Sequence, residues 1–225
     1  MKQVNRSIGL DLGLTHFAIC SDGVKFDNPQ FLKRDLDRLA KAQRKLARTQ
    51  KGSKNRAKVR LKVARIQARI ADCRRDFLHK LSTQLIRENQ AIGVETLAVM
   101  NMVKNRRLPR SISDAGWCMF VAMLEYKADW YGRTLVKIDR WTPTSKICSS
   151  CEHVVESLPL NIRQWTCENC SAAHGRDVNA AINIKRVAGL ADLCKNARGE
   201  ETSGVAQLDA VCALSRLVEA RIPFL

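Results

Sequence analysis

Apolar and polar residues alternate with a period of two along several short stretches of the chain. Residues 7–22 read SIGLDLGLTHFAICSD, in which aliphatic residues alternate first with glycines and Asp11 and then, after a turn near Gly13, with small residues. This alternation predicts two strands joined by a turn. Residues 91–97 and 134–138 are short and rich in β-branched residues, which predicts two further strands.

Residues 31–88 follow a different pattern, in which apolar residues recur every three or four positions. Before a break at Gly52 and Ser53 the repeated residues are Leu32, Leu36, Leu39 and Leu46, and after it they are Val59, Val63, Ile66, Ile70, Cys73 and Phe77. This spacing predicts two antiparallel helices that form a hairpin, with Cys73 in its apolar seam. A coiled-coil arm that joins two copies of the chain is the alternative.

Two more helices are predicted downstream. One is expected to begin at a cap formed by Ser111 or Ser113 and to end at Gly132. Its apolar stripe comprises Trp117, Phe120, Leu124 and Tyr131. The other follows Asp177, and its stripe comprises Val178, Ala181, Ile184 and Val187. The small side chains of Ala180 and Ala181 are expected to let this helix pack closely on a sheet.

The positive charge of the chain is concentrated in the predicted hairpin. The net charge is +17 over 225 residues, and residues 33–87 contain 19 Lys or Arg against 4 Asp, which is a net of +15. A one-sided charge of this kind indicates a polyanionic partner, most simply DNA or RNA, whereas an ordinary solvated helix face usually mixes both signs. The candidate phosphate-binding residues are Lys41, Arg44, Lys45, Arg48, Lys58, Arg65 and Arg69 in the hairpin and Arg106 and Arg107 in the loop 104–110.

Four cysteines form two C-x2-C pairs that are separated by fifteen residues. The pairs are Cys148 with Cys151 and Cys167 with Cys170. Four thiolates at this spacing are typical of a zinc ribbon with a closed, structural Zn²⁺ site. Two disulfides are the alternative, and the odd total of nine cysteines without a secretory signal argues against them. The cysteine content and the lack of a signal or an apolar run of about 18 residues indicate a cytoplasmic protein.

Three carboxylates lie at the edges of apolar elements and are candidates for catalysis. Asp11 lies inside the first predicted strand, Glu95 follows the β-branched run of the strand predicted over 91–97, and Asp177 begins a predicted helix. If all three met at one end of a sheet, they could hold two Mg²⁺ ions about 4 Å apart for phosphodiester hydrolysis. Asp11 as a solvent-facing strand residue and Asp177 as a simple helix cap are the alternatives.

Several segments in the same order make the chain resemble the C-terminal half of TnpB, or OrfB, proteins of insertion sequences, which are related to type V CRISPR nucleases. The matching segments span roughly residues 7–188 and read GLDLGLTHFAICSDG, DFLHKL, GVETL, RRLPRSISDAGW, YKADWYG, TPTSKICSSC, WTCENC and RDVNAAINI. The resemblance implies an α/β fold with an RNase H-like (RuvC) mixed sheet flanked by helices, interrupted by a basic helical hairpin and a zinc ribbon. It places the family's acidic residues on Asp11, Glu95 and Asp177 and its zinc ligands on the four paired cysteines.

The resemblance also implies a domain layout and an activity. The RuvC-like core would comprise residues 1–141, including the hairpin 31–88, and would continue over 173–190 after a ribbon at 142–172, leaving 191–225 as a tail. RNA-guided cleavage of DNA is the implied activity, with guide RNA and DNA as partners in a prokaryotic cytoplasm or nucleoid. Because Met1 directly precedes the first strand, the half that grips the guide is expected to be missing. A catalytically inactive nucleic-acid-binding remnant and a zinc-ribbon adaptor for proteins are the alternatives.

The sequence differs from the family's pattern at the turns of the expected ribbon. Glu152 and Ser171 stand where glycines often follow each C-x2-C pair, and Gly175 stands where an acidic residue usually precedes Arg176. Turns of this kind favour residues that tolerate a positive φ, so a lower zinc affinity is expected. Cys194 and Cys212 have no partner pattern and receive no role.

Overall fold

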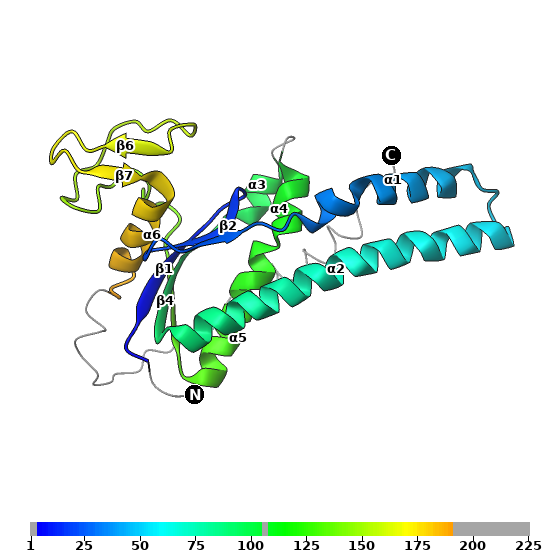
Figure 1. Ribbon diagram of the computed structural model, residues 1–225, viewed down its shortest axis with the longest axis horizontal. Coiled ribbons are helices and arrows are strands. Elements are labelled where there is room, and N and C mark those ends of the chain that lie inside the picture. The colour runs from blue at the N-terminus through cyan, green and yellow to red at the C-terminus, as the bar shows by residue number, and fades with distance from the viewer. Residues whose placement is uncertain (1–3, 105–107, 191–225) are drawn as a thin grey trace.

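The computed structural model describes residues 4–104 and 108–190, and a five-stranded mixed sheet organises them. The strand order is β3-β2-β1-β4-β5, with antiparallel pairing from β3 to β1 and parallel pairing from β1 to β5 (Figure 1). The strands are β1 (Ser7–Leu12), β2 (His16–Cys20), β3 (Lys25–Asp27), β4 (Ala91–Glu95) and β5 (Thr134–Ile138). The four strands predicted from the sequence are confirmed, and the short edge strand β3 was not predicted.

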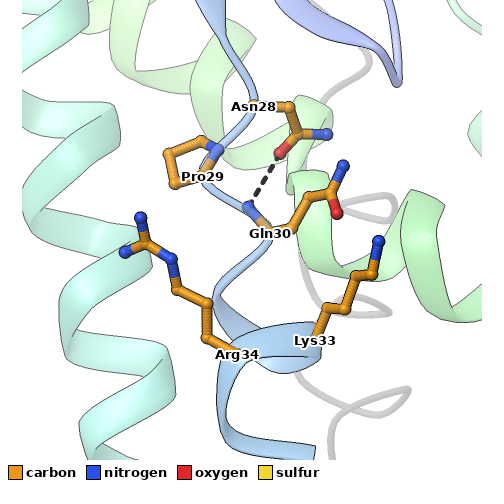
Figure 2. Close-up of a pocket in the computed structure, with 5 residues that line it drawn as sticks. All are labelled: Asn28, Pro29, Gln30, Lys33 and Arg34. Carbon is orange, nitrogen blue, oxygen red and sulfur yellow. Dashed lines mark hydrogen bonds between the residues drawn. The ribbon is translucent and has the colours of Figure 1, made fainter.

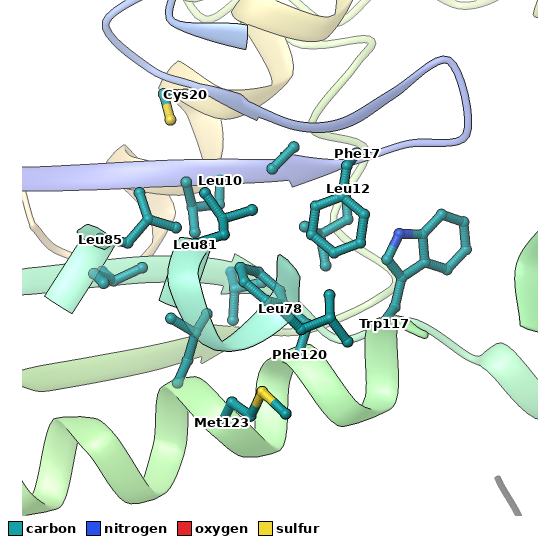
Figure 3. Close-up of a cluster of buried hydrophobic side chains, with 14 of the residues drawn as sticks. Leu10, Leu12, Phe17, Cys20, Leu78, Leu81, Leu85, Trp117, Phe120 and Met123 are labelled. Atoms are coloured by element: carbon teal, nitrogen blue, oxygen red, sulfur yellow. The ribbon is translucent and has the colours of Figure 1, made fainter. Parts of the chain in front are cut away.

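Helices cover both faces of this sheet. The long helix α2 (Lys54–Glu88) and α5 (Trp117–Tyr131) pack on one face, and α6 (Arg176–Val187) packs on the other (Figure 1). The main core lies between the sheet and the first pair, where Phe17 contacts Phe77 and Phe120 edge to face with centroids about 5 Å apart (Figure 3). Leu10 and Leu12 point into this core, which leaves Gly9 and Asp11 on the face toward α6.

The predicted helical hairpin is confirmed. Helix α1 (Phe31–Arg48) packs along α2, and the two reach away from the sheet as a separate arm (Figure 1). Its seam buries Leu39, Ala42, Leu46, Val59, Val63, Ile66 and Ile70. At the tip, Gly52 adopts a φ of +83° and the Ser53 hydroxyl accepts a hydrogen bond from the Arg56 backbone N–H, which caps α2.

Two residues assigned to the seam are exposed instead. Cys73 is exposed and Leu36 is 39% exposed, so both predictions were wrong. On α1, Leu36 lies off the seam formed by Leu39, Ala42 and Leu46, and on α2 a different stripe, which omits Cys73, is buried after Ile70. That stripe begins with Arg74, which is buried and bonded through Nη2 to Asp114 Oδ1 at 2.9 Å. The heptad pattern therefore predicts the arm correctly but not the place where the arm meets the core.

The predicted helix before Gly132 is two helices. A bend at Gly116, with φ +69°, separates α4 (Pro109–Ala115) from α5. Ser111 and Ser113 lie inside α4 rather than at a cap, since Pro109 occupies the first turn. Gly132 ends α5 as predicted, but the last member of the predicted stripe, Tyr131, is 37% exposed.

The remaining elements are short. They are α3 (Val99–Val103) and the two-stranded sheet of β6 (Gln164–Thr166) and β7 (Ala173–Gly175). Val187, expected in the apolar stripe of α6, is 48% exposed because that helix ends there. The loop residues Arg106 and Arg107 and the tail 191–225 lie outside the described residues. None of the helices in the described part of the chain combines the length and the apolar character that crossing a membrane requires.

Candidate functional site

The three candidate carboxylates come from elements that meet at one end of the sheet. Glu95 is the last residue of β4, and the parallel register that pairs Leu10 with Val94 brings Asp11 alongside it. Asp177 is in the first turn of α6, which packs against β1. The three acids are therefore neighbours, and the charges of Glu95 and Asp177 both act on Asp11.

A pair of glycines sets how closely α6 approaches this end of the sheet. Gly9 and Gly93 are register partners, and a β-carbon on Gly9 would lie 2.1 Å from the Ala181 carbonyl oxygen. The helix backbone therefore rests directly on the strands. Because Asp11 follows Gly9 by two residues and Asp177 precedes Ala181 by one helical turn, both carboxylates lie on the facing surfaces of strand and helix.

The electrostatics of Asp11 reflect this crowding. Burial raises the pKa of its carboxyl group from 3.8 to about 7, with further contributions from the charges of Glu95 and Asp177, while Arg176 and Arg163 act in the opposite direction. Burial also raises the pKa of Glu95. The Arg163 Nη1 atom lies 3.3 Å from Asp177 Oδ1. A bound cation would stabilise the ionised forms of Asp11 and Glu95, whose pKa values burial raises.

The three carboxylates do not converge on a single point. Within the described residues, the group of potential ligands whose atoms lie close enough to hold one ion consists of the four paired cysteines. Asp11, Glu95 and Asp177 do not form such a group.

The four cysteines form the arrangement that the sequence predicted. Their sulfur atoms all lie within 4.8 Å of one another, with Sγ–Sγ distances of 3.6 Å from Cys148 to Cys170 and from Cys151 to Cys167. None of the four is in a disulfide, which removes the alternative interpretation. Four converging thiols match the donor set that Zn²⁺ prefers.

Two equivalent turns aim the sulfurs at this point. In each turn the residue after the second cysteine has a positive φ, +64° at Glu152 and +58° at Ser171, and its N–H donates to the carbonyl of the first cysteine at 2.9 Å. The turns thus form without the glycines that favour this conformation. His174 adds a contact from β7, with Nε2 3.0 Å from Cys148 Sγ.

Helix α6 links the cysteine cluster to the carboxylates through residues that the sequence analysis did not assign. Asn179 Oδ1 accepts from the Ser149 N–H at 2.9 Å and its Nδ2 donates to the Ile147 carbonyl at 2.7 Å. Asn183 Nδ2 donates to the carbonyls of Thr144 and Ile147 at 2.8 and 2.7 Å. Both asparagines are 1% exposed. Two buried amides spaced four residues apart, in a helix with an apolar stripe, were the available signal.

The basic residues predicted to bind phosphate are exposed where the structure describes them. Those in the hairpin, Lys41, Arg44, Lys45, Arg48, Lys58, Arg65 and Arg69, all lie on its outer surface. An open depression of about 420 Å³ lies at the start of α1 and adds Lys33 and Arg34 to this surface (Figure 2). In the depression the Asn28 side chain accepts a hydrogen bond from the Gln30 N–H.

Comparison with known families divides the chain into two matched parts. Residues 1–106 match the family model OrfB_IS605, described as "Probable transposase". Residues 117–184, which include the four paired cysteines and Asp177, match the model of the Cas12f1-like TNB domain. Most of the described residues therefore fall within one of the two models.

Similar proteins exist in bacteria. The chain is 57% identical over 185 residues to a Streptomyces pristinaespiralis protein named "Putative RNA-guided DNA endonuclease", covering 82% of this chain and 46% of the relative. It is 33% identical over 192 residues to an Escherichia coli K12 protein with the same description, covering 79% of this chain and 48% of that one. The chain thus spans about half the length of these relatives.

Solved structures share the fold at low sequence identity. A CRISPR-Cas12f ternary complex matches with a TM-score of 0.59 at 20% identity, covering 82% of this chain and 40% of that one. A Cas12f1 complex with sgRNA and target DNA matches with a TM-score of 0.55 at 18% identity, covering 82% and 50%. These matches agree with the mixed sheet and its helices.

Proposed function

This chain belongs to the OrfB (TnpB) family of transposon-encoded proteins, and from that premise we propose that it carries the nuclease portion of an RNA-guided DNA endonuclease. The observation that carries the proposal is the Asp11 carboxyl group, half-buried at the end of the sheet and in electrostatic contact with Glu95 and Asp177. The sheet is proposed to be of the RNase H-like (RuvC) type. Three antiparallel strands, β3, β2 and β1, are continued by the parallel strands β4 and β5, and this order supports the assignment.

The proposed reaction is phosphodiester hydrolysis assisted by two Mg²⁺ ions. When bound, the ions would supply an activated water and stabilise the leaving oxygen. Asp11, on which the charges of Glu95 and Asp177 both act, would hold the ions together with these two acids. The raised pKa of Asp11 means that binding the ions also releases a proton from the site at neutral pH.

The cysteine cluster is proposed to be a zinc ribbon with a structural role. Cys148, Cys151, Cys167 and Cys170 would hold one Zn²⁺ and leave no position for a substrate. In this division, residues 1–141 and 173–190 would belong to the nuclease core and residues 142–172 to the ribbon, while residues 191–225 lie outside the described residues. The hydrogen bonds from α6 to the first cysteine turn support a ribbon that is anchored to the core.

DNA and a guide RNA are the proposed partners. The exposed basic surface of the hairpin supports contact with a phosphate backbone, and the similar Cas12f1 structure is a complex with sgRNA and target DNA. The chain spans about half the length of its relatives, so we propose guide RNA binding for a protein of the relatives' full length.

Cleavage of single-stranded DNA tests the proposal. The parent protein is expected to cut labelled DNA in Mg²⁺ and to stop cutting when the ion is removed, whereas Asp11→Ala and Glu95→Ala should cut at least about 100-fold more slowly. Glu125→Ala is a suitable control, because this acid lies on α5 and pairs with Lys137 instead. Absence of metal-dependent cutting, or cutting that both substitutions leave unchanged, would refute the nuclease assignment.

A non-catalytic DNA- or RNA-binding role is the second candidate. The ion pair between Arg163 and Asp177 favours it, because that contact satisfies one acid without a metal. Both candidates predict binding that weakens steeply with salt, while an adaptor that binds only proteins predicts salt-insensitive behaviour toward a polyanion. The cleavage assay distinguishes the nuclease from the non-catalytic binding protein. DNA affinity measured at increasing salt concentration tests the protein adaptor.

A further inference from the structure

Two tryptophan side chains in the described part of the chain are largely exposed to solvent. Trp130 is 74% exposed and Trp141 is 76% exposed. Exposure of so large an apolar side chain is costly, so each position calls for an explanation. The two residues lie at opposite ends of the same strand: Trp130 is near the end of α5, just before β5 begins, and Trp141 comes shortly after β5 ends.

Only Trp141 lies on the side of the carboxylates. The last residue of β5, Ile138, is the register partner of Glu95, and its carbonyl accepts a hydrogen bond from the Thr96 N–H at 3.1 Å. Trp141 is three residues further along the chain, and three residues span at most about 10 Å. The backbone of Trp141 therefore lies within about 10 Å of Ile138, the neighbour of Glu95 in the sheet.

The chain holds Trp141 in a defined turn and gives it a charged neighbour. The Trp141 N–H donates to Asp139 Oδ1 at 3.3 Å, and the Thr142 N–H donates to the Asp139 carbonyl at 3.2 Å. The Arg140 guanidinium carbon lies 4.8 Å from the centre of the Trp141 ring. This is a cation–π contact, and the exposure of Trp141 shows that it leaves most of the ring free.

We infer that Trp141 and Arg140 form a stacking platform for a base of single-stranded DNA beside the carboxylate site. An aromatic face stacks on any base, and a guanidinium next to it can pair with the adjoining phosphate, which together give affinity without sequence preference. The inference rests on the proposed function, because it places the stacked base on the strand that the carboxylates cleave. Trp130 has Tyr126 as its ring neighbour, at 4.7 Å, and lies at the end of β5 away from the carboxylates.

Binding of a fluorescein-labelled oligodeoxythymidylate to the whole chain tests the platform. Fluorescence anisotropy without Mg²⁺ avoids cleavage during the measurement. Trp141→Ala is expected to weaken binding roughly 5- to 150-fold, because stacking of one base contributes about 1–3 kcal/mol. Trp130→Ala, which removes an equally exposed tryptophan from the other end of β5, is expected to leave the affinity unchanged, and Trp141→Phe should retain most of it.

A second probe separates base stacking from phosphate binding. An oligomer of the same length that carries abasic sites has the same phosphates and nothing to stack, so Trp141→Ala should bind it as the parent does. Equal affinities of Trp141→Ala and Trp130→Ala for oligodeoxythymidylate would overturn the platform. So would an equal loss with the abasic oligomer, or an effect of Trp141→Ala that appears with oligouridylate only.

The platform and the proposed activity fail independently. If Asp11→Ala cuts like the parent while Trp141→Ala loses affinity, the hydrolytic assignment fails and the platform remains. If Asp11→Ala abolishes cutting while Trp141→Ala binds like the parent, the nuclease remains and the platform is refuted.

Discussion

Gly9 and Gly93 are register partners on neighbouring parallel strands, and α6 rests on both of them. A β-carbon on Gly9 would meet the Ala181 carbonyl at 2.1 Å, and one on Gly93 would meet the Ala188 β-carbon at 3.0 Å. The two glycines therefore bring a helix backbone into contact with strand backbones. This contact fixes the height of Asp177 above the sheet, because Asp177 is on the same helix.

Gly9→Ala should consequently push α6 away from β1. Since the obstructing atom belongs to the helix backbone and cannot rotate aside, we expect a loss of about 3 kcal/mol or more in the free energy of unfolding. Gly175→Ala is the matched control, because it lies next to the same helix with no atom within 4 Å of the new β-carbon and no positive φ. Urea unfolding of both variants measures the difference, and equal stabilities would contradict the close contact.

The raised pKa of Asp11 predicts a pH dependence of stability. In the folded state its pKa is about 7, against 3.8 as the reference value for the unfolded chain, so between these values the folded state binds more protons. Stability therefore falls as the pH rises through this window. Between pH 6 and 8, without Mg²⁺, the contribution of Asp11 should fall by about 1 kcal/mol. Asp11→Asn should remove this part of the slope and be the more stable protein at pH 8.

Mg²⁺ provides the control for that pH effect. A divalent cation at the site replaces the proton, so its addition should stabilise the parent at pH 8 more than it stabilises Asp11→Asn. Parallel stability curves for the two proteins from pH 6 to 8 would mean that Asp11 is ionised and well solvated in the folded state.

The sequence predicts the strands and the hairpin well because both have a regular period. The three-and-four spacing from Val59 to Ile70 describes one face buried against one partner, and the alternation in residues 7–12 separates Ile8, Leu10 and Leu12, which enter the main core, from Gly9, which contacts α6. The prediction of buried residues fails where a helix passes from one packing partner to another. Cys73 follows the period of the hairpin seam into a part of α2 where a different stripe is buried, Tyr131 is the last residue of α5, and Leu36 lies off the seam of α1, so all three are exposed. No local pattern signals where a second packing partner begins.

The two candidate sites also differ in how far the sequence predicts them. The cysteine cluster was predictable because its spacing is local and its chemistry tolerates few arrangements. The distances between Asp11, Glu95 and Asp177 depend on the strand register and on the contact of α6 with the glycine pair. The position of each acid in the sequence therefore suggests that the three are neighbours but does not determine these distances. Asn179 and Asn183 were missed because their partners are backbone atoms of Thr144, Ile147 and Ser149, which carry no sequence signal.

Metal analysis of cysteine variants tests the ribbon. The parent, prepared with zinc, should contain about one Zn²⁺ per chain, and Cys148→Ser should lose it because three thiolates hold zinc far less tightly. Cys73→Ser is the matched control, since Cys73 is exposed and outside the cluster. Mass spectrometry under non-denaturing conditions gives the stoichiometry. Retention of zinc by Cys148→Ser would show that this sulfur is not a ligand.

A buried ion pair at the root of the hairpin predicts a large difference between two adjacent arginines. Arg74 is 7% exposed and bonds to Asp114, whose Oδ2 also accepts from the Leu32 N–H at 2.9 Å, so one acid joins α1, α2 and α4. Arg74→Ala should cost about 3–5 kcal/mol because it leaves a buried carboxylate without its partner. Arg75→Ala, which removes an exposed pair with Asp72, should cost little. Thermal unfolding of the two variants measures the difference, and similar melting temperatures would contradict a stabilising role of the buried ion pair between Arg74 and Asp114.

The hydrogen bonds of Asn183 predict that α6 controls the stability of the cysteine cluster. Asn183→Ala removes the donor to the Thr144 and Ile147 carbonyls in a site that excludes water, which should cost about 1–3 kcal/mol. The first cysteine turn follows directly after Ile147, so this loss should loosen the turn. Transfer of zinc to a coloured chelator should therefore be roughly 5- to 100-fold faster than in the parent, if the turn must open before the metal leaves.

Val187→Ala is the control for that measurement, because it removes an exposed side chain from the end of the same helix. It should release zinc at the parent's rate. If Asn183→Ala also released zinc at that rate while being equally well folded, the turn would be held by its own hydrogen bonds alone. The helix would then carry Asp177 without any coupling to the cluster, and removal of zinc should leave the Asp11-dependent pH slope between pH 6 and 8 unchanged.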